Sequence, residues 1–423
     1  MKTIEVTNIE KFAENVIPKQ PQNSKSVVES ILKDVKKNGD DAIRKYEKKF
    51  SGATISSLQI SSTEISNAYD KISKTELDAL RLAKTRLENT ESAIKSLLKN
   101  KTINSNGIQI SKKFIPIQSV GCYVPGGLAK YPSSVIMSVI PAKIAGVRRI
   151  VVVSPPNSDG KIDPLTIVAA DICGASEIFK TGGAQSIAAL SYGTKSIPKV
   201  DKIVGPGGAF VTAAKSLVSQ DTGIDMLAGP TELGIIADDS ANPRFVALDL
   251  ISQAEHSSDT FCYLITTSHK LAMLVNKNIS EIVPKIQREK FVHSSLKNNG
   301  FIAICKTKSD MIKLANYLAP EHLQIMTKNP ESLSSKITAP GLILLGNNTP
   351  SSASDYVLGS NHILPTNGFG KIRGSLSVLD FIKTSTQVTC SKSSLSKIAK
   401  HLQALTKAEG LPNHYEAVEG RLK

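Results

Sequence analysis

The sequence contains no tryptophan, and aromatic residues make up only 5% of its 423 residues. Cysteine is also scarce: the five cysteines are widely separated, and no two of them form a Cys-x-x-Cys pair. This spacing excludes a zinc ribbon built from thiolates and argues against a scaffold held by disulfides. Unpaired cysteines are typical of a reducing compartment, so we expect a cytoplasmic protein.

Long hydrophobic runs are absent as well. The first twenty residues carry charges throughout and contain no apolar segment of the kind found in secretory signal peptides. The longest apolar stretch, at residues 135–147, is interrupted by Pro141 and Lys143, so it is too short to span a bilayer. We therefore expect no association with a membrane.

The sequence has no arginine-rich run, although its formal net charge is +15. Lysines are dispersed among acidic residues, as at residues 33–49, and aromatic residues are not interleaved with them. Nucleic-acid binding usually needs a concentrated basic patch or a stacking platform. We interpret the excess charge as a lysine-rich solvated surface and expect no nucleic-acid partner. Such a surface would also attract an anionic ligand such as a dinucleotide.

A chain of this length is expected to form two or three domains. Residues 24–50 and 62–100 repeat apolar side chains at helical spacing, with a break at Asn38-Gly39-Asp40 in the first stretch. Short apolar strands, glycine turns and helices then alternate over residues 149–218 and again over residues 233–345. This alternation is typical of parallel α/β units.

The fold class that we predict is therefore α/β, with two Rossmann-like but incomplete parallel-sheet domains. A helical N-terminal segment and a C-terminal arm complete it. We expect the N-terminal segment at residues 1–20 and a helical C-terminal arm at residues 377–423. One α/β domain would combine residues 21–124 with 232–376, and residues 125–231 would form the other.

Four of the seven histidines stand beside other polar residues, whereas His269, His293 and His401 have the lysine- or serine-rich surroundings of a surface. The four are His256, three residues after Gln253; His322, directly after Glu321; His362, seven residues after Asp355; and His414, five residues after Glu409. If the first segment is helical, its amide and imidazole lie on one face, one turn apart.

A divalent metal such as zinc binds imidazole nitrogens together with amide or carboxylate oxygens. Gln253, His256, Asp355 and His414 could supply that set. The alternative is that each polar cluster is an ordinary turn or helix cap, because separation in sequence says nothing about proximity in space.

Glu321 and His322 follow Pro320 at the point where a predicted helix gives way to a strand. Loops at such boundaries often carry reactive groups, and a glutamate beside a histidine suits general acid/base chemistry. A capped helix end is an equally good interpretation of the local pattern. Cys122 has no neighbouring base, so we interpret it as a packed thiol rather than a nucleophile.

Two glycine-rich turns, at residues 182–185 and 205–208, each precede a predicted helix. Backbone amides at the start of a helix attract phosphate groups. Neither turn has the G-x-G-x-x-G pattern followed by an acidic residue about twenty positions later. The turns alone are therefore a weak indication of nucleotide binding.

Taken in order along nearly the whole chain, these segments closely resemble the histidinol dehydrogenase family. The motifs that carry the resemblance are Tyr-Val-Pro-Gly-Gly (123–127), Gly-Gly-Ala-Gln (182–185), Val-Asp-Lys-Ile-x-Gly-Pro-Gly (200–207), Ile-Asp-Met-x-Ala-Gly-Pro-Thr-Glu (224–232), Ser-Gln-Ala-Glu-His (252–256), Ala-Pro-Glu-His-Leu (319–323), Asp-Tyr-x4-Asn-His-x-Leu-Pro-Thr (355–366), Gly-Ser-Leu-Ser-Val (374–378) and Glu-Gly-Leu-x2-His (409–414). The ordered set is specific, although no single motif is.

The resemblance implies the four-electron oxidation of L-histidinol to L-histidine through bound L-histidinal, the last step of histidine biosynthesis, with NAD as the oxidant. It implies one zinc ion per subunit, held by Gln253, His256, Asp355 and His414, with Glu321 and His322 as the acid/base pair. The residues that it places around the substrate are Thr231, Gln253, His256, His322, Asp355, His362, Glu409 and His414.

The resemblance further implies that Tyr123, Gln185 and the residue at position 208 contact NAD. The family usually has Asn where this chain has Gly208, so a side-chain contact to NAD is lost there while a backbone contact is retained. It also implies a homodimer that exchanges its C-terminal arm, so that Glu409 and His414 enter the site of the partner.

Three other functions remain open on the residues. The nearest is a zinc- and NAD-dependent dehydrogenase of the same family that acts on another polar alcohol, such as a sulfonated diol. Glu409 and His414, which follow the histidinol pattern, argue against it. The others are a zinc hydrolase with Glu321 as base, which needs no dinucleotide, and a basic nucleic-acid-binding protein.

Overall fold

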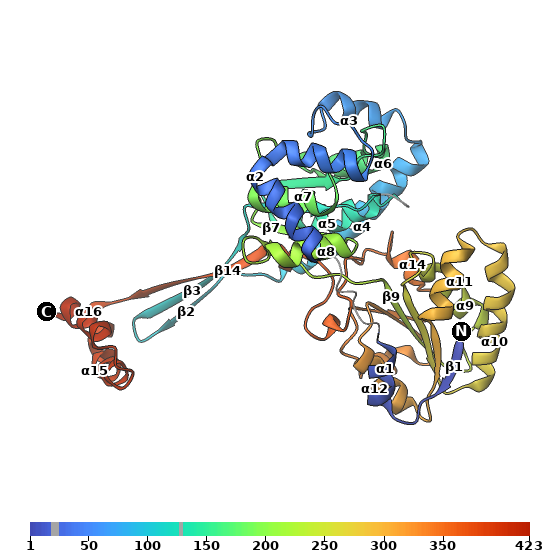
Figure 1. Ribbon diagram of the computed structural model, residues 1–423. Helices are drawn as coiled ribbons and strands as arrows, with labels where there is room; N and C mark the ends of the chain where they lie inside the picture. Colours follow the sequence, from blue (N-terminus) through green and yellow to red (C-terminus); the bar gives the residue numbers. More distant parts are fainter. Residues whose placement is uncertain (18–24, 127–129) are drawn as a thin grey trace.

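The computed structural model describes residues 1–17, 25–126 and 130–423 and shows two α/β bodies from which an arm projects (Figure 1). One body contains a six-stranded sheet in which all neighbouring strands are parallel. In order across this sheet the strands are β1 (Lys2–Glu5), β11 (Phe301–Ile304), β10 (Phe261–Thr266), β9 (Glu232–Ala237), β12 (His322–Met326) and β13 (Leu342–Leu345).

The other body contains a five-stranded sheet that is also parallel throughout. Its strands, in order across the sheet, are β6 (Glu177–Lys180), β5 (Arg149–Ser154), β4 (Ser119–Tyr123), β7 (Lys202–Val204) and β8 (Gly223–Ile224). Apart from the edge strand β1, both sheets follow the Rossmann order 3-2-1-4-5 when strands are counted along the chain. The predicted α/β fold class with two Rossmann-like sheets is confirmed.

The six-stranded sheet is buried on both faces because helices cover each side. Along β10, Cys262 and Leu264 pack into one apolar cluster, whereas Tyr263 and Ile265 pack into another. This alternation follows from the two-residue period of a strand. The first cluster includes helices α9 (Pro243–Ala254), α10 (His269–Ile282) and α11 (Glu289–Asn298), and the second includes α1 (Ile9–Val16) and α12 (Lys308–Leu318), as Figure 1 shows.

The five-stranded sheet is covered in the same way. One face carries α2 (Lys25–Phe50), α7 (Gly183–Tyr192) and α8 (Ala209–Val218), and the other carries α3 (Ser62–Tyr69), α4 (Lys74–Ser96), α5 (Pro132–Ala145) and α6 (Pro164–Cys173). Helix α2 is interrupted at Gly39, whose φ of 55° is not helical. The break that the sequence predicts at this position is confirmed.

The N-terminal helices pack against a different sheet from the one that we expected. Residues 21–124 were grouped with 232–376, but helices α2, α3 and α4 bury their apolar stripes against the five-stranded sheet. The segment 1–20, expected to stand apart, supplies strand β1 to the larger sheet. The expected boundary between residues 20 and 21 lies outside the described residues.

The arm begins as a three-stranded antiparallel ribbon in the order β14 (Ile382–Cys390), β3 (Ile108–Pro116) and β2 (Lys101–Ser105). It continues as helices α15 (Lys392–Ala408) and α16 (Pro412–Leu422), which lie far from both bodies in Figure 1. The expected arm at residues 377–423 was helical, but nine of its residues pair with β3 instead. The arm therefore needs the hairpin β2–β3 as its partner within the chain.

Short elements complete the fold: α13 (Pro330–Ser334), α14 (Ser351–Ser354), and the 3-10 turns η1 (Val283–Lys285), η2 (Phe369–Lys371) and η3 (Val378–Phe381). Among the helices of residues 1–17, 25–126 and 130–423, none combines the length and the apolar character that crossing a membrane requires.

Candidate active site between the two sheets

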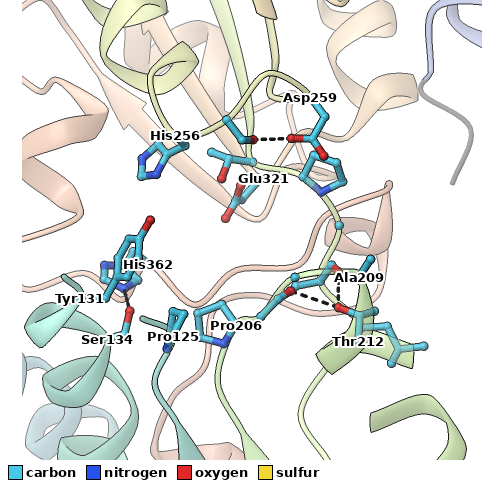
Figure 2. A pocket seen from close by; sticks show the side chains of 18 of the residues that line it. Pro125, Tyr131, Ser134, Pro206, Ala209, Thr212, His256, Asp259, Glu321 and His362 are labelled. Atoms are coloured by element: carbon cyan, nitrogen blue, oxygen red, sulfur yellow. Dashed lines mark hydrogen bonds between the residues drawn. The ribbon is translucent and has the colours of Figure 1, made fainter. Parts of the chain in front are cut away.

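A cleft of about 1720 Å³ lies between the two bodies and is lined by both. The larger sheet contributes the amino ends of β9 and β12, whereas the smaller sheet contributes loops that follow the carboxyl ends of its strands. Figure 2 shows His256 and Glu321 on one side of this space and Pro206, Ala209 and Thr212 on the other. The candidate residues that line the cleft are Gly208, Thr231, Gln253, His256, Glu321, His322, Asp355 and His362.

Glu321 and His322 stand where the sequence predicts them, between the end of α12 and the start of β12. The helix ends at Ala319, which has a left-handed φ of 45°. Strand β12 then runs between β9 and β13, so its backbone is fixed on both edges. Both side chains are buried, with 8% of Glu321 and 2% of His322 exposed, although they line the cleft.

The two ring nitrogens of His322 have different partners. Nδ1 lies 3.3 Å from the carbonyl oxygen of Glu232, which can only accept, so Nδ1 carries a proton. Nε2 lies 3.1 Å from Asp355 Oδ1. Burial lowers the pKa of this imidazole, but the carboxylates of Glu321 and Asp355 outweigh it and raise the pKa to about 9. Burial raises the pKa of Glu321 to about 7, against the attraction of His322.

Gln253 and His256 line the same part of the cleft as Asp355. Gln253 is in the last turn of α9, whereas His256 lies beyond the helix, which ends at Ala254 and is capped by Glu255. A bond from His256 N to Gln253 O, 3.2 Å long, keeps the two residues one turn apart. The condition that both residues lie on one helix is therefore met by Gln253 but not by His256.

The oxygen atoms of this group suit a metal. Gln253 Nε2 donates to Asp355 Oδ2 at 3.1 Å, which turns Gln253 Oε1 away. Oε1 is buried and has no hydrogen-bond partner among the described residues. An unpaired amide oxygen, an imidazole at the cleft and a carboxylate are donors that zinc accepts. No cluster of three His, Cys, Asp or Glu residues with metal-binding geometry occurs in the described part of the chain. Only His256 and Asp355 of this set are of those residue types.

His362 forms another part of the cleft wall. Its Nδ1 lies 2.7 Å from the carbonyl oxygen of Asp355, so it donates there and leaves Nε2 as an acceptor. Ser134 Oγ, on α5 of the body with the five-stranded sheet, lies 3.1 Å from that Nε2 (Figure 2). Thr231 lines the cleft directly before β9. These residues confirm that separate segments of the chain converge here.

Glu409 and His414 are not brought to this cleft by their own chain. Glu409 follows α15 and His414 belongs to α16, so both are on the projecting arm. Both residues are exposed, and neither lines the cleft. The remaining three histidines, His269, His293 and His401, are exposed as expected.

Tyr123 and Gln185 belong to neighbouring segments, but neither side chain lines the cleft. Both are buried, with 5% and 2% exposed. Gly183 N donates to Tyr123 Oη at 3.4 Å, and Gln185 Nε2 donates to Glu47 Oε1 at 2.8 Å. Position 127 of the Tyr-Val-Pro-Gly-Gly motif lies outside the described residues.

Glu47 is a buried residue of this region that the sequence did not reveal. Its Oε1 accepts hydrogen bonds from Thr181 Oγ1 and Gly182 N, both at 2.9 Å, as well as from Gln185. Glu47 is fully buried on α2, one turn after the core residue Ile43. Its place on the apolar stripe of a helix is the signal that could have identified it.

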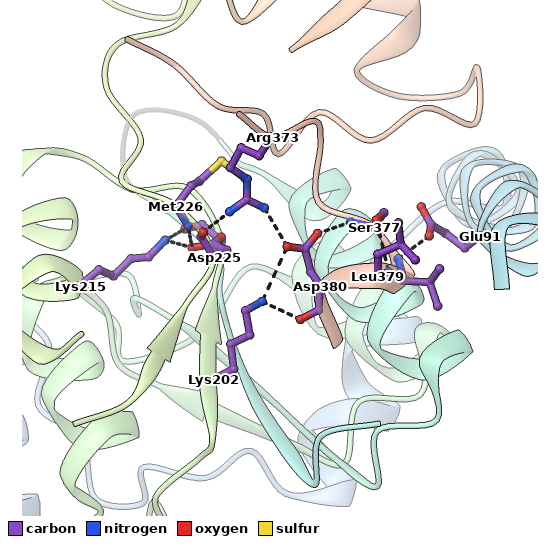
Figure 3. Close-up of polar contacts among 11 residues, drawn as sticks. Glu91, Lys202, Lys215, Asp225, Met226, Arg373, Ser377, Leu379 and Asp380 are labelled. Atoms are coloured by element: carbon purple, nitrogen blue, oxygen red, sulfur yellow. Dashed lines mark hydrogen bonds and ion pairs between the residues drawn. The ribbon is translucent and has the colours of Figure 1, made fainter. Parts of the chain in front are cut away.

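The second glycine turn opens α8 on the cleft wall opposite Glu321. Gly208 is the N-cap of α8 and provides no side-chain cap, so the first turn of this helix is open to an anion. Figure 3 shows the ionic network behind the turn. Asp225 accepts from Gly205 N at 2.8 Å and pairs with the buried Lys215, and Arg373 joins it to Asp380. These contacts hold the turn in place.

Cys122 is a core thiol, as expected. It is fully buried in β4, and burial raises its pKa to about 12, so it is not a thiolate at neutral pH. All five cysteines are free.

Comparisons with known proteins agree with the geometry. The family model for histidinol dehydrogenase matches residues 17–422. The histidinol dehydrogenase of Methanocaldococcus jannaschii is 43% identical over 413 residues, which cover 97% of this chain and 96% of that protein. The chain belongs to the histidinol dehydrogenase family. The family resemblance of the sequence motifs is thereby confirmed.

Other members of the family are similar over the same length. The histidinol dehydrogenase of Bacillus subtilis is 40% identical over 402 residues, which cover 95% of this chain and 93% of that protein. The crystal structure of histidinol dehydrogenase from Elizabethkingia anophelis superposes with a TM-score of 0.94 at 34% identity and covers 100% of this chain and 98% of that one. The arm and both bodies are therefore features of the family fold.

Proposed function

We propose that this protein oxidises L-histidinol to L-histidine through bound L-histidinal. Membership of the family supports the proposal, and one structural observation carries it. The buried pair Glu321 and His322 faces a cleft whose opposite wall is the glycine turn at the start of α8. The cleft therefore has a proton acceptor on one wall and the N-terminus of α8, which can bind an anion, on the other. An NAD-linked oxidation requires both.

The overall reaction needs two oxidations with water added between them. Histidinol and NAD⁺ give histidinal, NADH and a proton. Water adds to the aldehyde, and the hydrate with a second NAD⁺ gives histidine, NADH and further protons. Keeping the aldehyde bound in the cleft protects a reactive compound from side reactions.

In this proposal His322 and Glu321 move the protons. His322 is buried in the cleft wall and is oriented by Glu232 and Asp355. It accepts the alcohol proton at Nε2 in the first oxidation, which requires that Asp355 no longer accepts a hydrogen bond from that nitrogen. Glu321 removes a proton from the water that adds to the aldehyde. Burial raises the pKa of Glu321 to about 7, which matches the requirement that a base titrates near the working pH.

Gln253, His256 and Asp355 would hold one zinc ion, because the unpaired Gln253 Oε1 and the Asp355 carboxylate lie in the same cleft wall. When bound, zinc would clamp the imidazole and amino nitrogens of the substrate. Thr231 and His362, which line the same cleft, would contact the substrate directly. NAD would lie along α8 and position 208, with Tyr123 and Gln185 shaping the neighbouring loops.

The arm supports a homodimer with exchanged C-terminal segments. The site of a single chain lacks a fourth zinc ligand, while Glu409 and His414 are exposed on an arm that reaches away from both bodies (Figure 1). In the proposed dimer, His414 of the partner subunit completes the ligand set and Glu409 of the partner subunit contacts the substrate. The cytoplasmic location expected from the unpaired cysteines stays a prediction.

The test is an NAD reduction assay with purified protein and zinc. Addition of histidinol should give an increase in NADH absorbance, in a ratio of two NADH per histidine formed. The same assay with a sulfonated diol and other polar alcohols is the control for the substrate. Turnover of another alcohol without turnover of histidinol would contradict the proposed substrate, and product formation without NADH would indicate a hydrolase.

A further inference from the structure

We propose that Glu232 is a positioning residue. Its hydrogen bonds fix the Glu321–His322 pair and the loop that carries His362 relative to one another. This role rests on the proposed oxidation of histidinol. Glu232 is the first residue of β9 and does not line the cleft, so it does not contact the substrate itself.

Glu232 and Glu321 hold each other by a reciprocal pair of hydrogen bonds. Glu321 N donates to Glu232 Oε2 at 3.1 Å, and Glu232 N donates to Glu321 Oε2 at 3.0 Å. Each carboxylate therefore fixes the backbone of the other residue at the start of its strand. One oxygen of Glu321 is engaged in this exchange, so the direction in which Glu321 faces the cleft depends on Glu232.

The other oxygen of Glu232 reaches a third segment. Glu232 Oε1 accepts from Asn367 N at 2.8 Å. Asn367 has a left-handed φ of 54°, and its neighbour Thr366 accepts from Gly229 N at 2.6 Å through Oγ1. The chain between Asp355 and Asn367 also carries His362, so this contact anchors one end of that loop.

His322 depends on the same residue through the backbone. The carbonyl oxygen of Glu232 lies 3.3 Å from His322 Nδ1 and accepts its proton, which orients the ring so that Nε2 lies against Asp355 at the cleft. A shift of Glu232 would move the acceptor of the imidazole together with the anchor of Glu321. The positions of both reacting groups, Glu321 and His322, therefore depend on Glu232.

A carboxylate is needed at this position because two backbone N–H groups point at it from different segments. An amide would turn an NH₂ donor toward one of them. The position is also costly for an acid, since only 6% of Glu232 is exposed. Burial raises the pKa of Glu232, and Glu321 adds to this, whereas the hydrogen bonds from the two N–H groups lower it and favour the carboxylate. An apolar residue would be more stable at the start of a buried strand. The glutamate is explained by the two N–H groups, of Glu321 and Asn367, that it accepts from.

The test is Glu232→Gln, assayed with histidinol and NAD. We expect kcat to fall about 100-fold, the loss that follows a displacement of about 1 Å in reacting groups. The KM for NAD should stay within about twofold, since α8 and its glycine turn do not contact Glu232. Supplying histidinal directly should give the same fall in kcat, because Glu321 loses its anchor.

Glu91→Gln is the matched control. Glu91 is a glutamate with 2% exposure that accepts a backbone hydrogen bond from Val378 N at 2.6 Å, outside the cleft lining. The kcat of Glu91→Gln should stay within about twofold of wild type. Both variants lose one buried carboxylate, but Glu91 lies away from the cleft. Glu232→Asp keeps the charge but shortens the side chain, so it serves as a second variant if Glu232→Gln does not fold.

Wild-type kcat in a folded Glu232 variant would overturn the inference. An equal fall in the Glu91 control would also overturn it, because loss of any buried carboxylate would then suffice. Absence of histidinol oxidation by the wild-type protein would instead contradict the proposed function, so the two failures are distinguishable.

Discussion

Gln253 Nε2 donates to Asp355 Oδ2 at 3.1 Å, and this bond leaves the buried Gln253 Oε1 without a partner among the described residues. The two side chains come from α9 and from the end of α14, about a hundred residues apart in sequence. A buried polar atom without a partner costs free energy unless a ligand satisfies it. The relationship between these two residues therefore predicts the effect of removing the amide.

Gln253→Leu should weaken zinc binding at least tenfold, because it removes the unpaired oxygen and releases Asp355. The measurement is zinc content after dialysis against a graded series of chelator concentrations. Gln324→Leu is the control, since Gln324 is also fully buried but does not line the cleft. Equal zinc retention by the two variants would exclude Gln253 as a ligand.

His322→Asn should lower kcat by about 10²–10⁴-fold, the usual contribution of a positioned acid or base. Zinc content should stay near that of wild type, because His322 contacts Asp355 but is not in the proposed ligand set. Steady-state NADH formation and metal analysis on the same preparation check both statements. Loss of zinc in this variant would mean that the roles of His322 and the ligands are misassigned.

Gly208→Asn should lower the KM for NAD. A Cβ at this position would meet nothing within 4 Å, so the side chain fits without displacing a neighbour. One added hydrogen bond is worth about 0.5–1.5 kcal/mol, or roughly 2–10-fold in KM. Gly207→Ala should instead raise the KM for NAD, because the added Cβ would lie 2.4 Å from Val211 and disturb the turn. An unchanged KM in Gly208→Asn would show that position 208 does not face the cofactor.

A mixture of His322→Asn subunits and His414→Asn subunits should regain activity if the arms are exchanged. Each variant alone is expected to be inactive, but a mixed dimer would contain one intact site of its two. Random mixing would restore about a quarter of wild-type activity. The measurement is NADH formation after denaturing and refolding the subunits together, with each variant refolded alone as the control. No recovery would contradict exchange of the arm.

Glu91→Gln should change how stability depends on pH. Burial raises the pKa of Glu91 from its ordinary 4.5 to about 7 in the folded state. The folded protein then binds more protons than the unfolded chain between these values, so this residue lowers the free energy of unfolding as pH rises from about 4.5 to 7. The variant lacks this loss, which is on the order of 3 kcal/mol. Urea unfolding of both proteins at pH 5 and pH 8 measures the difference, and parallel pH profiles would contradict it.

Local patterns along the sequence predicted much of the fold. The apolar run at residues 261–266 is strand β10, and the helix expected at residues 209–218 is α8 with the same bounds. Parallel strands buried on both faces are continuous apolar runs, and a glycine turn before a helix is a local requirement of the backbone. Such features depend on neighbours in sequence and can be read without the fold.

The same is true of part of the site. Glu321 and His322 were expected between a helix and a strand, and β12 starts at His322, shortly after α12 ends at Leu318. His256 shows the limit, because the pattern alone left open whether the helix that carries Gln253 extends to it, and the helix ends at Ala254. The exact end of a helix depends on its cap and on the chain that follows, which the periodic pattern does not specify.

The tertiary structure alone decided which surfaces meet. The amphipathic stripes of α2, α3 and α4 predict burial but not which sheet they cover, because any apolar face of suitable shape would serve. Strand β14 pairs with β3, which lies more than 260 residues earlier, and nothing local in either segment encodes that register. The arrangement of the arm therefore could not be derived from the sequence pattern.

The sequence by itself determined that the chain forms parallel α/β units and which motifs carry acid, base and ligand side chains. Only the tertiary structure decided that Glu47 is a buried acceptor for the glycine turn at residues 182–185 and that Glu232 is one for Glu321. A glutamate looks like a surface residue wherever its partners are distant in sequence. Its role appears only when folding brings backbone N–H groups to its carboxylate.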